Sequence, residues 1–239
     1  MEIINKLLNY KDLKIVQNTD WFAFSLDSVL LANFVTINKS TKKIIDFCTG
    51  NAPIPLILST KINAHIVGVE LQKEIFDLAQ KSIKINNLEG KIELLNMNVK
   101  DLANIYETDT FDIITCNPPY FKLKEGSNLN KNDIKTIARH EIELNLKDIF
   151  SLARKLLKNN GIISIVHRPD RLMEILEIMK ENNIEPKKIQ FVYPKKNSEC
   201  NTILIEGSKN GNPGLKILPP LYVHDENGKY LEEIEDMFQ

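Results

Sequence analysis

Short apolar runs and longer helix-like stretches alternate along most of this chain, and this alternation limits the possible fold more than any other feature. Residues 42–47, 65–70, 91–97 and 111–116 are rich in β-branched side chains, and helical patterns or turns separate them. Strands that alternate with helices form parallel sheets, because each crossover helix returns the chain to the same edge. The sequence therefore predicts an α/β fold: a Rossmann-like, doubly wound, mostly parallel seven-stranded sheet.

The two ends of the chain depart from this pattern. No clear helix separates "KKIQFVY" from "CNTILIEG", so an antiparallel edge strand is expected there. Residues 1–40 precede the first strand and contain a helix-like stretch that Asp27 is suited to cap. We expect residues 1–40 to form a small appendage over the ligand edge of the sheet, and residues 41–239 to form the main part of a single domain.

The composition narrows the class of protein. Hydrophobic residues make up 43% of the 239 residues, and no apolar run approaches the roughly 20 residues that span a bilayer. Three widely spaced cysteines without a C-x-x-C pair suggest neither a disulfide framework nor a zinc site. Outside residues 222–239, which hold six acids and one lysine, 30 basic residues face 26 acidic ones. We expect a cytoplasmic monomer that binds no membrane and no metal.

A glycine turn follows the first strand of the alternation. In "DFCTGNAP", residues 46–53, Gly50 permits a sharp turn and a close approach to a ligand. The pattern is not G-x-G-x-x-G, since Ala52 stands where a further glycine would allow a pyrophosphate to approach. A cofactor without phosphate would not need that glycine. An ordinary structural turn explains the same residues equally well.

An acidic residue ends the second strand. Glu70 lies 20 residues after Gly50, where doubly wound sheets place a carboxylate that accepts hydrogen bonds from ribose hydroxyls. The alternative is an N-terminal cap for a helix beginning at Leu71. The spacing and the strand together favour the ribose.

The sequence "NPPY" ends the strand at 111–116. Asn117 and Pro118 can direct a side-chain oxygen and a carbonyl oxygen at one point, because the prolines fix the backbone. A planar amine with two N–H groups would match these acceptors, and Tyr120 offers a face for stacking. Asn-Pro also forms common turns. We call Asn117, Pro118 and Tyr120 the clamp, because together they could hold a planar amine. Their position after an apolar strand favours this clamp over a simple turn.

Six stretches spread over almost the whole chain carry a resemblance to a known family: "SLDSVLLANF", "DFCTGNAPIPLILS", "CNPPY", "IARHEIELNL", "VHRPDRLMEIL" and "GLKILPPLYVHDENGKYLEEI". With them the chain resembles the bacterial tRNA adenine-N6 methyltransferases. These are class I S-adenosylmethionine-dependent enzymes with an NPPY-type motif, whose best-known members modify adenine-37 of a valine tRNA. The resemblance implies S-adenosyl-L-methionine as cofactor, tRNA as partner, and N6-methylation of an adenine, with adenine-37 of the anticodon loop as the expected target.

The resemblance and the positions of individual residues together give expected roles. Asp46 is expected either to orient the glycine loop or to meet the ammonium group of the cofactor. Asn117, Pro118 and Tyr120 are the expected catalytic residues. Cofactor contacts are expected from seven residues: Asp27, Ser28, Asp46, Gly50, Glu70, Asn98 and Asn117. Substrate contacts are expected from four residues: Tyr120, Lys122, Lys124 and Arg139. The three basic residues follow Asn117 in a polar stretch that would suit phosphate contacts, and a merely solvated loop explains them equally well.

Two departures from the family pattern leave choices open. Ala52 stands where the family usually has a second glycine, which would set the loop slightly farther from the cofactor. Many relatives place an acid after the third strand, whereas this chain has Asn98 there and Asp101 three residues later. An amide oxygen can accept the same bond from an adenine amine. Asn98 is the preferred residue, and capping a helix remains an equal alternative for Asp27 and Ser28.

Other functions account for fewer of these features. A glutamine-N5 methyltransferase acting on protein uses a similar clamp, but it usually carries a separate helical recognition domain. A DNA adenine methyltransferase would need a target-recognition domain. A NAD-dependent oxidoreductase is disfavoured by Ala52 and by "NPPY". A non-catalytic RNA-binding module that kept the fold is disfavoured by the intact clamp and by Glu70.

Overall fold

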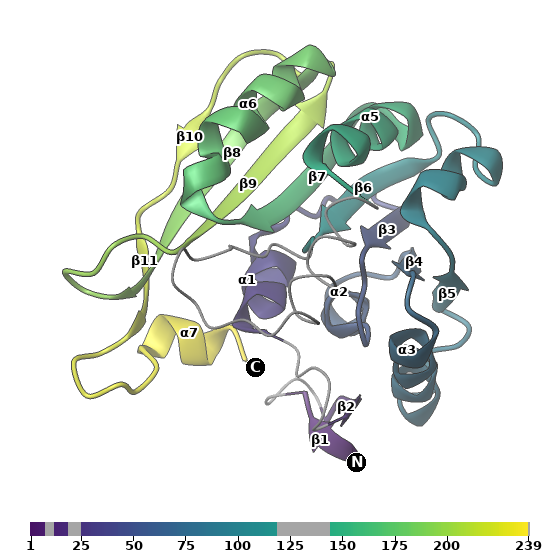
Figure 1. Cartoon of the computed structure of the whole chain (residues 1–239), viewed down its shortest axis with the longest axis horizontal. Helices are drawn as coiled ribbons and strands as arrows, with labels where there is room; N and C mark the ends of the chain where they lie inside the picture. The colour runs from purple at the N-terminus through teal and green to yellow at the C-terminus, as the bar shows by residue number, and fades with distance from the viewer. Residues whose placement is uncertain (8–11, 19–24, 119–143, 239) are drawn as a thin grey trace, which may run out of the picture.

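The computed structural model describes all residues except 8–11, 19–24, 119–143 and 239 (Figure 1). Among the described residues the central sheet contains nine strands. They are β3 (Lys43–Phe47), β4 (His65–Glu70), β5 (Ile92–Asn96), β6 (Phe111–Cys116), β7 (Leu157–His167), β8 (Ile184–Lys195), β9 (Thr202–Lys209), β10 (Lys216–Ile217) and β11 (Leu221–His224).

The strand order explains where a ligand can bind. The sheet runs β10-β8-β9-β7-β6-β3-β4-β5, with β11 pairing beside β10 on β8. Neighbours from β7 to β5 are parallel, whereas β9 is antiparallel to both β7 and β8. Strand order reverses between β3 and β6, which is the point where open α/β sheets bind ligands at their carboxyl edge.

The predicted fold class is confirmed, and two details differ. The sheet has nine described strands instead of seven, because the short strands β10 and β11 add to the outer side of β8. The expected antiparallel pairing of the last two long strands is confirmed in β8 and β9, but β9 lies between β7 and β8 and not at the edge of the sheet. Strands of two and four residues are too short to give a recognisable pattern in sequence.

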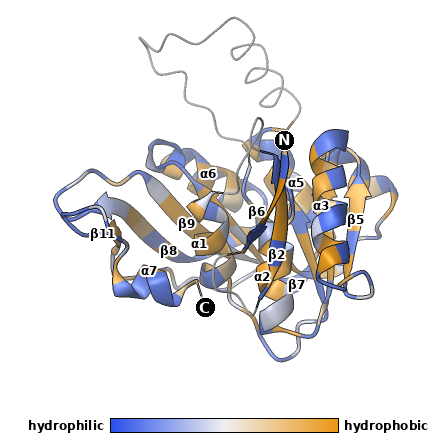
Figure 2. Cartoon of the chain, turned by 90° about the horizontal axis from the view of Figure 1, so that it is seen from below, coloured by the Kyte–Doolittle hydropathy of each residue, from blue (hydrophilic) through white to orange (hydrophobic). Residues whose placement is uncertain are grey.

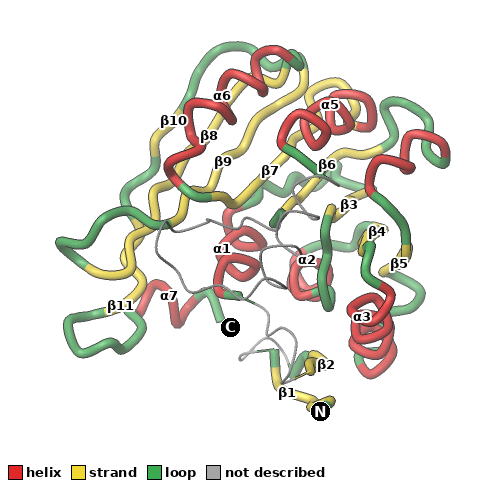
Figure 3. The backbone as a smooth tube through the Cα atoms, viewed as in Figure 1, coloured by secondary structure: helices red, strands yellow, loops and turns green. Residues whose placement is uncertain are grey.

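Helices cover both faces of the sheet, as the red coils around the yellow strands show (Figure 3). The described helices are α1 (Leu26–Phe34), α2 (Pro53–Lys61), α3 (Lys73–Ile85), α5 (Leu146–Leu156), α6 (Leu172–Glu181) and α7 (Glu232–Asp236), with 3-10 turns η1 (Val99–Asn104) and η2 (Pro169–Arg171). One apolar cluster joins the sheet to α1, α2 and α3, and a second joins it to η1, α5 and α6. The ribbon of α3 alternates between hydrophilic and hydrophobic along its length (Figure 2), as expected for a helix with one buried face.

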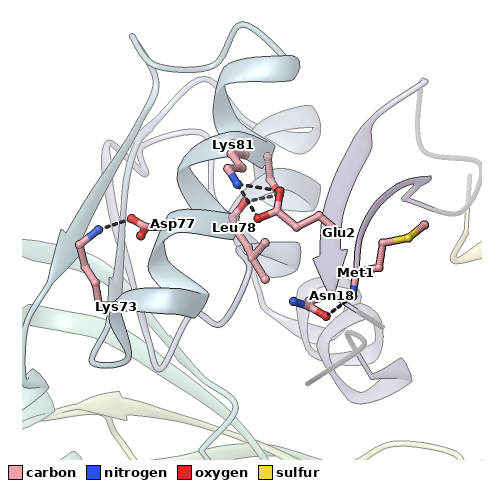
Figure 4. A network of polar contacts seen from close by, with 8 residues as sticks. Met1, Glu2, Asn18, Lys73, Asp77, Leu78 and Lys81 are labelled. Carbon is pink, nitrogen blue, oxygen red and sulfur yellow. Dashed lines mark hydrogen bonds and ion pairs between the residues drawn. The ribbon is translucent and has the colours of Figure 1, made fainter. Parts of the chain in front are cut away.

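The chain begins with a hairpin that the sequence did not predict. Strands β1 (Glu2–Lys6) and β2 (Lys14–Asn18) are antiparallel and form their own small sheet. Lys81 of α3 donates to both carboxylate oxygens of Glu2, at 2.5 and 2.6 Å, and the amino group of Met1 donates to Asn18 (Figure 4). The hairpin is therefore fixed to α3, which follows the strand that ends in Glu70.

Helix α1 begins earlier than expected. Its N-cap residue is Ser25, and Asp27 lies inside the first turn, so the predicted capping role of Asp27 is wrong. Val29, Leu30 and Leu31 are buried in the cluster shared with α2 and the sheet. The boundary of an appendage at residue 40 stays a prediction. None of the helices in the described part of the chain is long and apolar enough to cross a membrane.

Candidate cofactor and substrate site

The loop after β3 has an unusual backbone. Cys48, Gly50 and Ala52 all have positive φ angles, of 57°, 59° and 71°. Left-handed backbone favours glycine and costs other residues roughly 1 kcal/mol or more. Ala52 thus adopts the conformation that a glycine would take, and its methyl group is fully buried. A Cβ atom built on Gly50 would meet no atom within 4 Å, so open space lies beside this backbone.

Glu70 holds this loop from the end of the neighbouring strand. One carboxylate oxygen accepts the N–H of Gly50 at 3.0 Å, and the other accepts the N–H of Gln72 at 2.9 Å. The residue is 6% exposed. The N-cap of α3 is Gln72, so Glu70 does not occupy the capping position that was the alternative to ribose binding. The structure brings together Gly50 and Glu70, which the sequence predicted on the basis of their spacing.

Asp46 lies beneath the same loop and is completely buried. Its carboxylate accepts the hydroxyl of Thr49 at 2.7 Å and that of Thr115, on β6, at 2.6 Å. Burial raises the pKa of Asp46 to about 7; the two hydroxyl bonds lower it, and the charge of Glu70 raises it. Gly68 gives Thr49 room, since a Cβ there would lie 3.0 Å from the Thr49 oxygen. Asp46 therefore joins the glycine loop to the strand that leads to Asn117.

Asn51 connects the loop to the N-terminal hairpin. Its amide nitrogen donates to the carbonyl of Val16 at 3.0 Å, and the N–H of Val16 donates to Ser82 of α3 at 2.9 Å. Asn51 is 3% exposed, and its side-chain oxygen is the one buried side-chain N or O atom without a hydrogen-bond partner among the described residues. The bond to Val16 fixes which end of the amide is nitrogen.

The described part of the clamp lies beside α1. The amide nitrogen of Asn117 donates to the hydroxyl of Ser28 at 3.1 Å. The amide oxygen of Asn117 therefore points away from Ser28. Pro118 is buried and Asn117 is partly buried. The structure thus brings together Ser28 and Asn117, which the sequence placed in one site although 89 positions separate them. Four other predicted residues lie outside the described residues: Tyr120, Lys122, Lys124 and Arg139.

Strand β5 lies beside β4, and Asn98 follows its carboxyl end. Residues Glu70 and Asn96 are partners in the register of β4 and β5, and Asn96 donates to the carbonyl of Glu70 at 2.9 Å. Asn98 follows two residues later as the N-cap of η1, where its oxygen accepts the N–H of Lys100 at 2.9 Å. An amide oxygen has a second lone pair for a ligand. Asp101 is exposed within η1, and the choice between the two stays a prediction.

Sequence reasoning missed several residues that shape this site. Thr49 and Thr115 hold Asp46, Asn96 holds the backbone of Glu70, and Asn51 holds the hairpin. A signal was available only for Thr49 and Asn51, which lie within the glycine loop. In the described part of the chain no group of three or more histidine, cysteine or acidic side chains could hold a metal ion.

The fold and the site together define a class of protein. A glycine turn after one parallel strand, bonded to a carboxylate at the end of the next, is typical of Rossmann-like enzymes that hold a cofactor containing a nucleoside. Within this class, the chain belongs to the methyltransferase domain family, whose model matches residues 38–221.

Individual relatives agree with this family. A curated protein from Aliivibrio salmonicida, named tRNA1(Val) (adenine(37)-N6)-methyltransferase, is 24% identical over 232 residues, covering 94% of this chain and 93% of its own. Relatives from other bacteria carry the same name. They resemble this chain over most of its length.

Solved structures show the same fold. A structure described as a predicted O-methyltransferase from Agrobacterium tumefaciens has a TM-score of 0.71 at 18% identity, covering 89% of this chain and 95% of the other. A geranyl diphosphate C-methyltransferase from Streptomyces coelicolor, solved with S-adenosyl-L-homocysteine, has a TM-score of 0.56 at 10% identity, covering 76% and 78%. At these identities the likeness concerns the fold.

Proposed function

We propose that this protein transfers a methyl group from S-adenosyl-L-methionine to the N6 amine of an adenine in tRNA, at adenine-37 of the anticodon loop. The observation that carries the proposal is the position of Asn117, which follows β6 at the carboxyl edge of the sheet and donates to Ser28. Membership of the methyltransferase domain family and the printed names of the relatives support the same reaction.

The residues present fit this cofactor. Glu70 has two carboxylate oxygens at the end of β4, and vicinal ribose hydroxyls can donate to such a pair. The backbone beside Gly50 is open, which suits a cofactor that lies against the loop without a pyrophosphate. We assign Asp27 and Ser28 to the methionine end of such a molecule and Asp46 to the support of the glycine loop beside it, and the oxygen of Asn98 can accept a bond from its adenine amine. The cofactor supplies an activated methyl group on a sulfonium.

The chain contributes positioning and electrostatics. The amide oxygen of Asn117 and the carbonyl oxygen of Pro118 accept the two N–H bonds of the target amine. These acceptors favour a pyramidal nitrogen and stabilise the positive charge that it gains as it is methylated. Ser28 holds the amide nitrogen of Asn117, so that its oxygen faces the amine. A strong base is not required, because the proton can leave after transfer.

The target base must leave its stack to reach Asn117. An adenine in a loop is easier to extrude than one in a duplex, which favours an anticodon-loop position. Tyr120 would stack on the extruded base, and Lys122, Lys124 and Arg139 would contact phosphates. A tRNA substrate also places the protein in the cytoplasm, and we propose that it acts there as a monomer.

Product analysis tests this proposal. The protein is incubated with labelled S-adenosylmethionine and, separately, with total tRNA from a strain lacking its gene, with total DNA and with protein extract. We expect N6-methyladenine in tRNA, at one position of one isoacceptor, and far less label in the same time from an Asn117→Ala control. Label in glutamine would establish a protein methyltransferase instead, and label in DNA adenine would contradict the RNA substrate.

A further inference from the structure

Two thiols lie where the glycine loop meets the clamp. Cys48 directly follows β3, and Cys116 is the last residue of β6, immediately before Asn117. The two strands are parallel neighbours, and their register pairs Phe47 with Cys116. Neither cysteine forms a disulfide. Cys116 is buried, whereas Cys48 is partly exposed.

The backbone turns the two side chains toward the same cluster. In a regular strand Cys48 would point away from the face occupied by Phe47. Its positive φ breaks this alternation, and Cys48 packs against the apolar cluster that contains Cys116. Strands lie about 4.8 Å apart and rise about 3.3 Å per residue, so a diagonal pair has Cα atoms about 6 Å apart. Disulfides commonly span this distance.

The two thiols also differ in chemical character. Burial raises the pKa of Cys116 well above its usual range, and a hydrogen bond to Cys48 and the charges of Cys48 and Asp46 raise it further. Cys116 therefore keeps its proton. Cys48 is the more exposed residue of the pair, and its thiol interacts with that of Cys116. Redox-sensitive cysteines are commonly accessible to solvent and lie next to a second cysteine whose sulfur can react with the oxidised one.

We propose that Cys48 and Cys116 form a reversible disulfide in response to a peroxide. The Cys48 thiolate attacks one peroxide oxygen, the O–O bond breaks, and the released hydroxide takes a proton to become water. The Cys116 thiol then gives its proton to the oxygen on Cys48 as the Cys116 sulfur attacks the oxidised Cys48 sulfur. The S–S bond forms, the S–O bond breaks, and the hydroxide leaves as water with the Cys116 proton. Two thiols and one hydrogen peroxide thus give one disulfide and two waters, and a thiol reductant reverses the change.

This bond would alter the neighbouring site. A disulfide bond is about 2.05 Å long, shorter than any contact between two unbonded sulfur atoms. Forming it draws the loop toward β6 and shifts the backbone on both sides, at Gly50 and at Asn117. We expect the oxidised protein to bind S-adenosylmethionine at least about tenfold more weakly, which is about 1.4 kcal/mol. This second effect rests on the proposed function, whereas the bond itself does not.

Peptide mapping of the full chain tests the bond. The reduced protein is treated with hydrogen peroxide, alkylated, digested without reductant and analysed by mass spectrometry. We expect one peptide pair joined through Cys48 and Cys116, lost in Cys48→Ser. The linked peptides should persist in the matched control Cys200→Ser, because Cys200 is not part of the proposed pair. Cys200 is partly buried, and its thiol donates to the carbonyl of Thr202. Cross-links to Cys200, or oxidation of Cys48 alone to sulfinic acid, would overturn the proposal.

Calorimetry with S-adenosylmethionine on the reduced, oxidised and re-reduced protein tests the second effect. Weaker binding after oxidation, restored by dithiothreitol, is the expected result. An unchanged affinity in fully cross-linked protein would refute the coupling to the site. A reduced protein that binds no cofactor would count against the proposed function, while the mass of the linked peptides would still decide whether the disulfide forms.

Discussion

Replacing Asp46 with asparagine should make the stability of the protein less sensitive to a rise in pH from acidic to neutral values. Asp46 is completely buried, and burial raises its pKa from 3.8 to about 7. In the unfolded chain the same carboxyl ionises near the lower value. Between these two values the folded protein holds a proton that the unfolded chain has lost. The contribution of Asp46 to stability is therefore complete below pH 3.8, falls as the pH rises to 7, and is constant above it.

The size of the effect follows from the two pKa values. Each unit is worth about 1.4 kcal/mol, so the whole interval corresponds to about 4 kcal/mol. Between pH 5 and pH 8, the same linkage relation gives a loss of about 2.5 kcal/mol in the free energy of unfolding. Asparagine has the shape of the acid and no charge. Its oxygen and nitrogen can pair with the hydroxyls of Thr49 and Thr115, which rotate to accept or donate.

Urea denaturation of both proteins at pH 5, 6, 7 and 8 measures this difference. Other titrating groups are common to both proteins and cancel in the comparison. We expect the asparagine variant to gain about 2.5 kcal/mol on the wild type between pH 5 and pH 8, with nearly all of the gain below pH 7.5. A constant difference between the two proteins over this range would refute the account of Asp46 as a buried carboxyl that ionises near neutral pH.

Three further predictions concern the residues around the loop. Glu70→Ala should weaken S-adenosylmethionine binding by roughly 1.5–3 kcal/mol in calorimetry, whereas the exposed Glu74→Ala control should not; equal affinities would remove Glu70 from the site. Asn51→Ala leaves a buried carbonyl of the hairpin unpaired and should lower the free energy of unfolding by about 1–2 kcal/mol; an unchanged value would mean that the hairpin is held by other contacts. Neutralising Lys122 and Lys124 should reduce the slope of log affinity for tRNA against log salt; an identical slope would show that neither contacts phosphate.

Much of the fold could be predicted because local patterns determine it. The strand at 65–70 and the strand at 111–116 have the predicted bounds, since half of the residues in each are β-branched and short loops flank both. The carboxyl edge of a parallel sheet then brings together whatever follows each strand. That rule predicts that Gly50, Glu70 and Asn117 lie at one edge of the sheet, and the structure has each of them at, or within three residues of, the end of a parallel strand. Their joint role in one site stays a prediction.

Other features depend on contacts that no local pattern records. Thr115 bonds to Asp46 across two strands that are 69 positions apart, so its role cannot be recognised from either segment alone. Strand β1 has only five residues and is mostly exposed, which leaves it without the apolar alternation of a buried strand. Helix α1 begins at Leu26, and Ser25 rather than Asp27 is its N-cap, because buried packing of the helix decides its start.

The central claim is that Asn117 holds the target amine during methyl transfer. Single-turnover rates with labelled cofactor and purified tRNA test it, together with calorimetry on the same proteins. Asn117→Ala should lower the rate by roughly 10²–10³, as expected for one lost preorganised contact, while the affinity for S-adenosylmethionine changes far less. Ser28→Ala keeps the Asn117 oxygen but removes the partner that orients it, so its loss of rate should be smaller. A wild-type rate in Asn117→Ala, or a loss explained entirely by weaker cofactor binding, would contradict the account.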